Sequence, residues 1–390
     1  MSSMVYNFPP EITYGWGESK QLGKLAASIG SKVLIVTDEG VAKAGLLTPL
    51  EIQLTESGVK YAVYRGIQPN PTDENVYNGV KLLREESCDV VVALGGGSPM
   101  DAAKGIILMT KHPGQLRDYY RGEENPRSIT SNVPYFIAMP TTSGTGSEVS
   151  RGALITDTRD NRKRALSSKY LLPKNVILDP ELTSRMPPKL TAHTGLDALS
   201  HLLEAYAVDS YSPIADALAK EGLQLISRSL LKAYRDGEDK TAREDMMMSS
   251  TMGALAFSKG LGVVHSLAHQ LSTQIGIPHG AACGIIMPHA IMFNIEGANG
   301  EKTAKKYANF AEIFGVNSSI LPPHQAGEEA AKLISRLLEE LDVPCHLSEW
   351  GVKMSDIDIM AKNAMLDHCH PKNPRTCTEE TMRKLFIRAM

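Results

Sequence analysis

The sequence predicts an α/β domain with a parallel sheet over residues 1–185, followed by an all-helical domain over residues 186–390. Three observations predict this. The first half alternates apolar runs with helical patterns, and strand patterns stop after Leu190. In addition, 390 residues exceed one typical domain of roughly 100–200 residues.

Four apolar runs in the first half are typical of strands that are buried on both faces. Such strands occur in parallel sheets with helical crossovers. The runs lie in the stretches SKVLIVTD (31–38), VKYAVYRG (59–66), CDVVVALGGGS (88–98) and VPYFIAMPTTSGTGSE (133–148).

The second half carries long helical patterns, GLDALSHLLEAYAV (195–208), ADALAKEGLQLISRSLLKAY (215–234) and GEEAAKLISRLLEELDV (327–343). Between the halves, Pro180, Pro187 and Pro188 interrupt regular structure. A domain boundary near residue 185 follows.

The composition is that of an ordinary globular protein, with 42% hydrophobic and 22% charged residues and a net charge of -3. This charge disfavours a nucleic-acid partner. We find no targeting segment and no apolar run of the roughly 18 residues that a membrane span needs, so we expect a cytoplasmic protein. Five cysteines without a C-x-x-C pair argue against a disulfide framework or a thiolate zinc site, so we expect nitrogen and oxygen to hold any metal.

A phosphate-binding turn is predicted where DVVVALGGGSPMDAAKGIIL passes from a strand through three glycines into a helix that opens at Ser98. Glycines let the backbone approach an anion, and the N–H groups of a helix start attract phosphate. Ser98 and Asp101 also resemble a capping box. A purely structural turn is the alternative, because a single glycine cluster does not exclude it. The G-x-G-x-x-G fingerprint is absent, so a standard Rossmann assignment is not justified.

Two further features favour a nucleotide ligand. The loop PTTSGTGSE (140–148) follows a strand, and ligands of α/β sheets bind outside the carboxyl ends of strands. Asp38 ends another strand, where a carboxylate accepts hydrogen bonds from ribose and repels the 2′-phosphate of NADP. A solvated loop and a turn-forming aspartate are the alternatives.

A metal site is predicted from two helical segments. Asp197 and His201 are four residues apart, and His265 and His279 lie in HSLAHQLSTQIGIPHG on either side of a break at Gly276 and Pro278. One carboxylate and three imidazoles suit Fe²⁺, Zn²⁺ or another divalent first-row metal, with iron our first expectation. A surface histidine at 201 and a core histidine at 265 are the alternatives. His193 and His289 are expected to lie outside the site.

Together, these motifs resemble the iron-dependent (group III) alcohol dehydrogenases over essentially the whole chain. The matching motifs are QPNPTDENV, GGGSPMDAAKG, PTTSGTGSEV, LDPELT, GLDALSHLLEAY, HSLAHQLSTQIGIPHG and Asn373-Pro374-Arg375. The resemblance implies the architecture shared with dehydroquinate synthase-like enzymes, NAD and a divalent metal as cofactors, and interconversion of small primary alcohols or diols with aldehydes. It also implies a homodimer or larger homo-oligomer.

Carried over by position, the resemblance implies that Asp197, His201, His265 and His279 bind the metal. It implies cofactor contacts at Asp38, Asn70, Gly96, Gly97, Ser98, Asp101, Thr141, Thr142, Thr145 and Lys163. His269 matches a histidine near metal and substrate, and it either relays the proton or only supplies a hydrogen bond. Phe257, Lys259 and Cys369 match positions of the substrate pocket.

Lys259 and His370 depart from the family pattern. Extra positive charge at a pocket favours an anionic short-chain aldehyde, whereas the preferred interpretation places both residues on the surface. Two other function classes stay open. A dehydroquinate synthase-like lyase needs a dense Lys/Arg cluster beside the metal helices, and the segments around His201 and His265 carry few such residues. A metal-binding protein without turnover does not explain the glycine and threonine loops.

Overall fold

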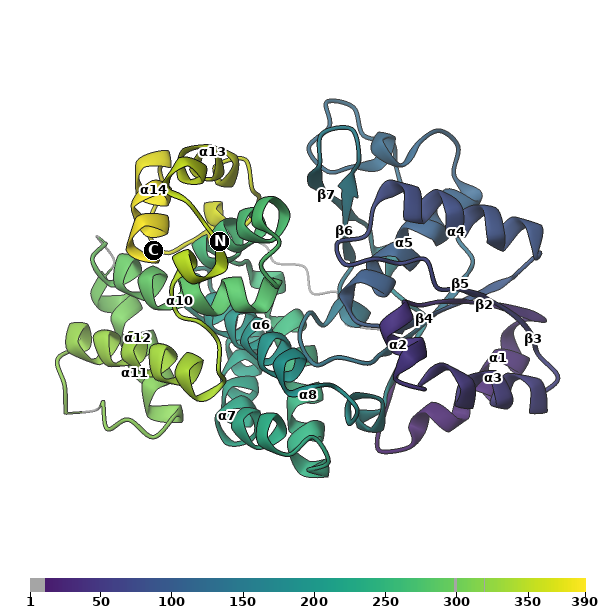
Figure 1. Ribbon diagram of the computed structural model, residues 1–390, viewed down its shortest axis with the longest axis horizontal. Coiled ribbons are helices and arrows are strands. Elements are labelled where there is room, and N and C mark those ends of the chain that lie inside the picture. Colours follow the sequence, from purple (N-terminus) through teal and green to yellow (C-terminus); the bar gives the residue numbers. More distant parts are fainter. Residues whose placement is uncertain (1–10, 298–299, 319) are drawn as a thin grey trace. The chain divides into compact units, whose positions relative to one another are not determined.

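The computed structural model describes residues 11–297, 300–318 and 320–390. They form two compact units, an α/β unit up to Arg185 and a helical unit from Met186 (Figure 1). The predicted fold class is confirmed.

The α/β unit is built on six parallel strands in the order β1-β8-β5-β4-β2-β3. The strands are β1 (Glu11–Tyr14), β2 (Lys32–Val36), β3 (Lys60–Tyr64), β4 (Val90–Gly95), β5 (Tyr135–Pro140) and β8 (Asn175–Leu178). The four predicted strands are β2, β3, β4 and β5. Every residue of the central strand β4 is buried, as its unbroken apolar run requires.

Helices cover both faces of this sheet, with α1 and α3 on one face and α4 and α5 on the other (Figure 1). The helices are α1 (Leu22–Ile29), α2 (Glu39–Lys43), α3 (Leu47–Glu56), α4 (Asp73–Glu85) and α5 (Gly97–Lys111), with the short turns η1 (Glu18–Gln21), η2 (Leu116–Tyr119), η3 (Ser147–Val149), η4 (Lys169–Leu171) and η5 (Pro180–Thr183). An antiparallel hairpin of β6 (Gly152–Asp157) and β7 (Arg162–Ser167) forms a separate sheet that the sequence analysis did not predict.

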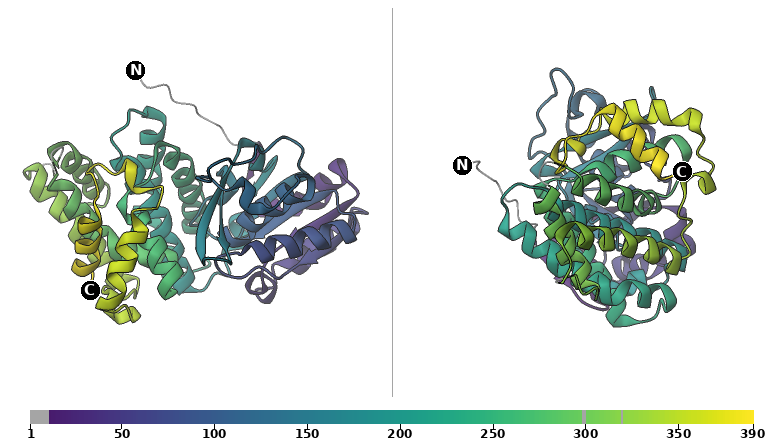
Figure 2. Two further views of the ribbon diagram at one scale, coloured as in Figure 1. Left: turned by 90° about the horizontal axis from the view of Figure 1, so that it is seen from above. Right: turned by 90° about the vertical axis from the view of Figure 1, so that its left-hand side faces the viewer.

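The described part of the helical unit contains helices and turns but no strand (Figure 2). The helices are α6 (Pro188–Ala207), α7 (Pro213–Arg235), α8 (Lys240–Ala256), α9 (Val263–Gln270), α10 (His279–Ile295), α11 (Gly300–Ile313), α12 (Pro323–Glu340), α13 (Met354–Ala364) and α14 (Glu379–Arg388). The short turns are η6 (Phe257–Lys259), the π-helical η7 (Leu271–Ile275), η8 (Leu347–Trp350) and η9 (His370–Lys372).

Helices α6 and α10 form the centre of the helical unit, because most of their residues are buried. The predicted break after α9 occurs where Gly276 adopts a left-handed conformation (φ 87°) and Pro278 precedes α10. Among the described residues, no helix is both long and apolar enough to cross a bilayer.

Candidate functional site

The four predicted metal ligands converge within the helical unit. Asp197 and His201 lie one turn apart on α6, His265 lies on α9, and His279 is the first residue of α10. From Oδ1 of Asp197, the Nε2 atoms of these histidines are 3.9 Å (His201), 4.0 Å (His265) and 3.5 Å (His279) away. The rings of His201 and His265 stack with their centroids 4.6 Å apart.

A glycine lets α10 bring His279 against α6. A Cβ atom at Gly280 would lie 1.7 Å from the carbonyl oxygen of His193 and 3.1 Å from Cβ of Asp197. No side chain fits in that space, so this close helix contact depends on glycine.

The donor atoms fit a divalent cation. Nε2 of His265 is buried and makes no hydrogen bond with the described residues. Burial of such a polar atom costs free energy unless a cation or a donor accepts its lone pair. Nδ1 of the same ring donates to Oε2 of Glu204 over 2.6 Å. Burial alone lowers the pKa of His265, but the hydrogen bond and charge of Glu204, with the charges of Asp197 and Asp367, raise it above the ordinary value.

Cys283 lies beside these donor atoms and was not considered among the candidate ligands, since only nitrogen and oxygen ligands were expected. Asp197, His265, His279 and Cys283 each offer one ligand atom, and these atoms lie within 4.8 Å of one another. The thiol sulfur is 3.7 Å from Nε2 of His279, one helical turn earlier. The H-x-x-x-C spacing in PHGAAC was the available signal.

His269 lies beside this cluster, with its ring stacked on that of His279 at 5.2 Å between centroids. Its Nδ1 donates to Oδ2 of Asp367 over 2.7 Å. Burial alone raises the pKa of Asp367, but the charge and hydrogen bond of His269, the charge of His368 and the N–H of Cys369 hold it well below its usual range. Asp367 was also missed by the sequence analysis.

The expected substrate-pocket residues have different surroundings. The ring of Phe257 lies 5.1 Å from the ring of His201, and Cys369 is buried beside Asp367.

Lys259 is buried, so its placement on the surface was wrong. Its ammonium group forms an ion pair with Asp216 at 2.5 Å. Nε2 of His370 lies 3.1 Å from the carbonyl oxygen of Met365.

In the α/β unit, the glycine loop leads from β4 into α5 at Gly97, and Gly96 is the N-cap without a side-chain cap. A Cβ at Gly96 would lie 3.1 Å from Oγ1 of Thr142, and one at Gly97 would lie 2.8 Å from Cγ2 of Thr145. The two predicted loops are therefore packed together. The uncapped first turn of α5 offers backbone N–H groups to an anion.

The predicted capping box of Ser98 and Asp101 was wrong, because α5 begins one residue earlier and Asp101 has other partners. Its carboxylate accepts hydrogen bonds from Oγ of Ser147 (2.6 Å) and the N–H of Leu154 (2.8 Å). The buried Lys104 donates to the carbonyl oxygens of Ser147 (2.7 Å) and Gly152 (2.6 Å). These contacts attach the loop 140–148 and the start of β6 to α5.

The other predicted cofactor residues lie on loops and strand ends of the same unit. Asp38 caps α2 by accepting the N–H of Val41 over 2.9 Å. Thr141 is buried, and its N–H donates to the carbonyl oxygen of Gly95 over 3.0 Å. Asn70 has a left-handed backbone (φ 56°) before α4, and Lys163 lies on β7.

Comparisons with known proteins agree with this architecture and these motifs. The profile of the iron-containing alcohol dehydrogenases matches residues 9–180, and the profile of the carboxy-terminal region of the Fe-containing alcohol dehydrogenase family matches residues 191–390. The chain is 37% identical over 384 residues to an NAD-dependent methanol dehydrogenase of Bacillus methanolicus, covering 98% of each chain. It is 38% identical over 363 residues to a 1,3-propanediol dehydrogenase of Klebsiella pneumoniae, covering 92% of each.

Among solved structures, the crystal structure of a 1,3-propanediol oxidoreductase matches with a TM-score of 0.94 and 36% identity, covering 100% of both chains. The matching profiles span both units, and the identities extend over almost the whole length. The chain therefore belongs to the iron-containing alcohol dehydrogenase family and is an oxidoreductase that interconverts alcohols and aldehydes.

Proposed function

We propose that this enzyme uses NAD and one divalent metal ion to interconvert small primary alcohols or diols with aldehydes. The observation that carries the proposal is the convergence of Asp197 with three imidazoles around the buried Nε2 of His265.

We assign metal binding to Asp197, His201, His265 and His279, with Fe²⁺ first and Zn²⁺ or another divalent ion as alternatives. A cation held there would supply Lewis-acid polarisation of the substrate oxygen, and bound NAD would supply the hydride acceptor or donor.

We assign NAD binding to the α/β unit. The N–H groups at the start of α5 suit the pyrophosphate, and we assign its contacts to Gly96, Gly97 and Ser98. The carboxylate of Asp38 suits ribose hydroxyls and disfavours a 2′-phosphate. Thr142 and Thr145 belong to the loop 140–148, which packs against Gly96 and Gly97. The proposed set of NAD contacts is completed by Asn70, Asp101, Thr141 and Lys163.

We assign proton handling to His269. Asp367 accepts its Nδ1–H, which leaves Nε2 as the atom that accepts the alcohol proton during oxidation and returns it during reduction. The stacking on His279 supports this assignment, because it places the ring beside the proposed metal ligands.

For the substrate, we propose neutral short-chain alcohols and diols before anionic aldehydes. A preference for an anionic short-chain aldehyde rests on Lys259 and His370. The ammonium group of Lys259 is already neutralised by Asp216, and Nε2 of His370 faces a backbone carbonyl. Phe257 and Cys369 remain the proposed pocket residues.

The test is an absorbance assay at the NADH band. Metal-loaded protein is mixed with NAD and a panel of alcohols and diols, and then with NADH and aldehydes. We expect NADH to form in the first case and to be consumed in the second, and we expect His265→Ala to lose both bound metal and turnover. No absorbance change with any pair would favour a lyase or a binding protein.

We further propose a cytoplasmic location and a homodimer or larger homo-oligomer, on the basis of composition and family resemblance. Light scattering after size-exclusion chromatography measures the oligomeric state directly.

A further inference from the structure

We infer that Glu204 is a positioning residue that prepares His265 for metal binding and at the same time caps the helix that carries it. This inference rests on the metal site proposed above. Glu204 follows Asp197 and His201 on α6, and spacings of four and seven residues place all three on one helix face.

The carboxylate of Glu204 accepts two hydrogen bonds from α9. Oε2 lies 2.6 Å from Nδ1 of His265, and Oε1 lies 2.7 Å from the backbone nitrogen of Val264. Glu204 is itself buried, so both bonds form away from water, where they are strong. One side chain of α6 therefore joins α9 at two points.

The bond to Nδ1 determines which nitrogen of His265 is free to bind a metal. Because Nδ1 carries the proton and donates it to Glu204, Nε2 presents its lone pair on the side that faces Asp197. The same bond limits rotation of the ring. The imidazole is thus held in a metal-binding tautomer and orientation before any ion arrives.

The bond to Val264 replaces a missing helix cap. Gly262, the N-cap of α9, has no side-chain cap, yet the first N–H groups of a helix need acceptors. The N–H of Val264 donates to Oε1 of Glu204, and the N–H of Val263 donates to Oδ1 of Asn373 over 3.2 Å. A Cβ at Gly262 would lie 2.7 Å from both acceptor oxygens, so glycine is needed for this arrangement.

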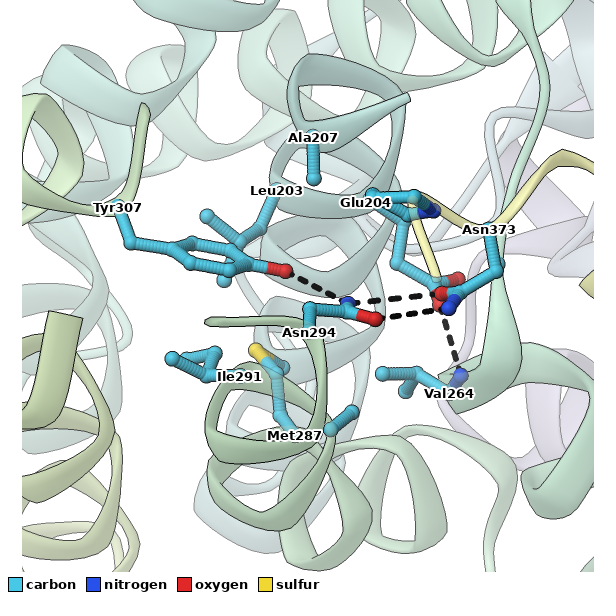
Figure 3. A pocket seen from close by; sticks show the side chains of 12 residues that line it. Leu203, Glu204, Ala207, Val264, Met287, Ile291, Asn294, Tyr307 and Asn373 are labelled. Carbon is cyan, nitrogen blue, oxygen red and sulfur yellow. Dashed lines mark hydrogen bonds between the residues drawn. The ribbon is translucent and has the colours of Figure 1, made fainter. Parts of the chain in front are cut away.

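Asn373 is held by a network that does not touch His265, and this provides a control. Its Nδ2 donates to Oδ1 of Asn294 over 2.7 Å, and Nδ2 of Asn294 donates to the hydroxyl of Tyr307 over 2.9 Å (Figure 3). Asn373 therefore shares the helix-capping task with Glu204 but not the contact with the imidazole.

Glutamine at 204 has the same shape but only one acceptor oxygen. It faces two N–H donors, so in either orientation its NH₂ group opposes one of them. Glu204→Gln should therefore loosen His265 or uncap α9 without changing the packing volume.

The test uses Co²⁺ as the probe, with equilibrium dialysis against the metal-free full-length protein and the cobalt d–d absorption as a second readout. We expect Glu204→Gln to raise the Kd for Co²⁺ about 10–100-fold, and Asn373→Ala to raise it less than about threefold. Gly262→Ala keeps every ionisable group but displaces the Glu204 carboxylate together with Oδ1 of Asn373, whose own effect Asn373→Ala measures, so it should also raise the Kd. It serves as the test if Glu204→Gln does not fold by circular dichroism.

An unchanged Kd in Glu204→Gln, or in Gly262→Ala where that variant serves as the test, would overturn the inference. Equal losses in Glu204→Gln and Asn373→Ala would overturn the role assigned to the imidazole contact, because helix capping alone would explain them. Failure of the unsubstituted protein to bind Co²⁺ would instead remove the proposed metal site itself.

Discussion

Oδ2 of Asp367 lies 2.7 Å from Nδ1 of His269, while Oδ1 of the same carboxylate accepts bonds of 2.9 Å from both Oγ of Ser266 and the N–H of Cys369. Three donors therefore fix the carboxylate, and the carboxylate fixes the ring. This arrangement fixes the direction of Nε2 of His269, which the proposed role of His269 as proton carrier requires.

If His269 carries the proton, His269→Ala should lower kcat roughly 100-fold or more, because a positioned general acid or base contributes about that much. Bound metal should stay near the level of the unsubstituted enzyme, since His269 is not among the proposed ligands. Steady-state kinetics and elemental analysis of the same samples measure both.

Added imidazole provides the control for this variant. It should restore part of the lost rate, because a small base fits the space that the ring leaves. A loss that imidazole does not reverse, or a rate within about tenfold of the original, would assign His269 a purely structural hydrogen bond.

The NAD preference can be separated from the helix cap at Asp38. Serine caps helices as well as aspartate does, so Asp38→Ser should preserve α2 and remove only the carboxylate. We expect the ratio of kcat/KM with NADP to that with NAD to rise by roughly tenfold or more, which corresponds to about 1.4 kcal/mol. An unchanged ratio would leave Asp38 with the capping role alone.

Lys259 is expected to affect stability more than specificity. Lys259→Met leaves the carboxylate of Asp216 without its buried partner, and we expect a loss of about 1–3 kcal/mol in unfolding free energy. Thermal unfolding should show a clear drop in Tm. Lys305→Met, which removes an exposed ion pair with Glu301, is the matched control and should change Tm little.

Substrate kinetics decide the alternative role of Lys259. The KM values for a carboxylated aldehyde and for its uncharged counterpart should change equally in Lys259→Met. A selective rise for the carboxylated substrate would place Lys259 in the pocket after all.

The lowered pKa of His289 predicts that the folded protein loses stability in acid. Burial, with the charges of Arg388 and His346, lowers the pKa of this imidazole from 6.5 to about 4. Between these values the unfolded chain binds the proton and the folded chain does not, so stability is present above pH 6.5 and is lost as the pH falls toward 4.

His289→Gln removes this linkage. In metal-free protein, the drop in Tm between pH 7.5 and pH 5 should be smaller in the variant by about 4–8 °C, which corresponds to roughly 2 kcal/mol. Parallel Tm profiles for the two proteins would show that His289 titrates alike in the folded and unfolded states.

The fold class was predictable from local patterns, and the four proposed ligands from their helical spacing together with the family resemblance. Asp197 and His201 share a helix face by their spacing, and Gly276 and Pro278 mark the break that brings His279 in from another helix. Strands β2, β3, β4 and β5 were found as long apolar runs. Strands β1 and β8 have four residues each, too few for a recognisable pattern.

The supporting contacts were not predictable because they join distant parts of the chain. Glu204 and His265 are 61 positions apart, and His269 and Asp367 are 98 apart. Asp101 was assigned to a local capping box, but the tertiary contact with Ser147, 46 positions away, prevailed. Lys259 was expected on the surface. Buried lysines are rare unless paired, and nothing in its own segment indicates Asp216 as the partner.

The central claim is tested most directly by anomalous diffraction at the metal edge, using crystals grown from Fe²⁺- or Zn²⁺-loaded protein. The account predicts one dominant peak about 2.0–2.2 Å from Asp197, His201, His265 and His279, with the sulfur of Cys283 outside ligand distance. A dominant peak on His269, Asp367 and Cys369, or no peak at the four proposed ligands, would contradict it.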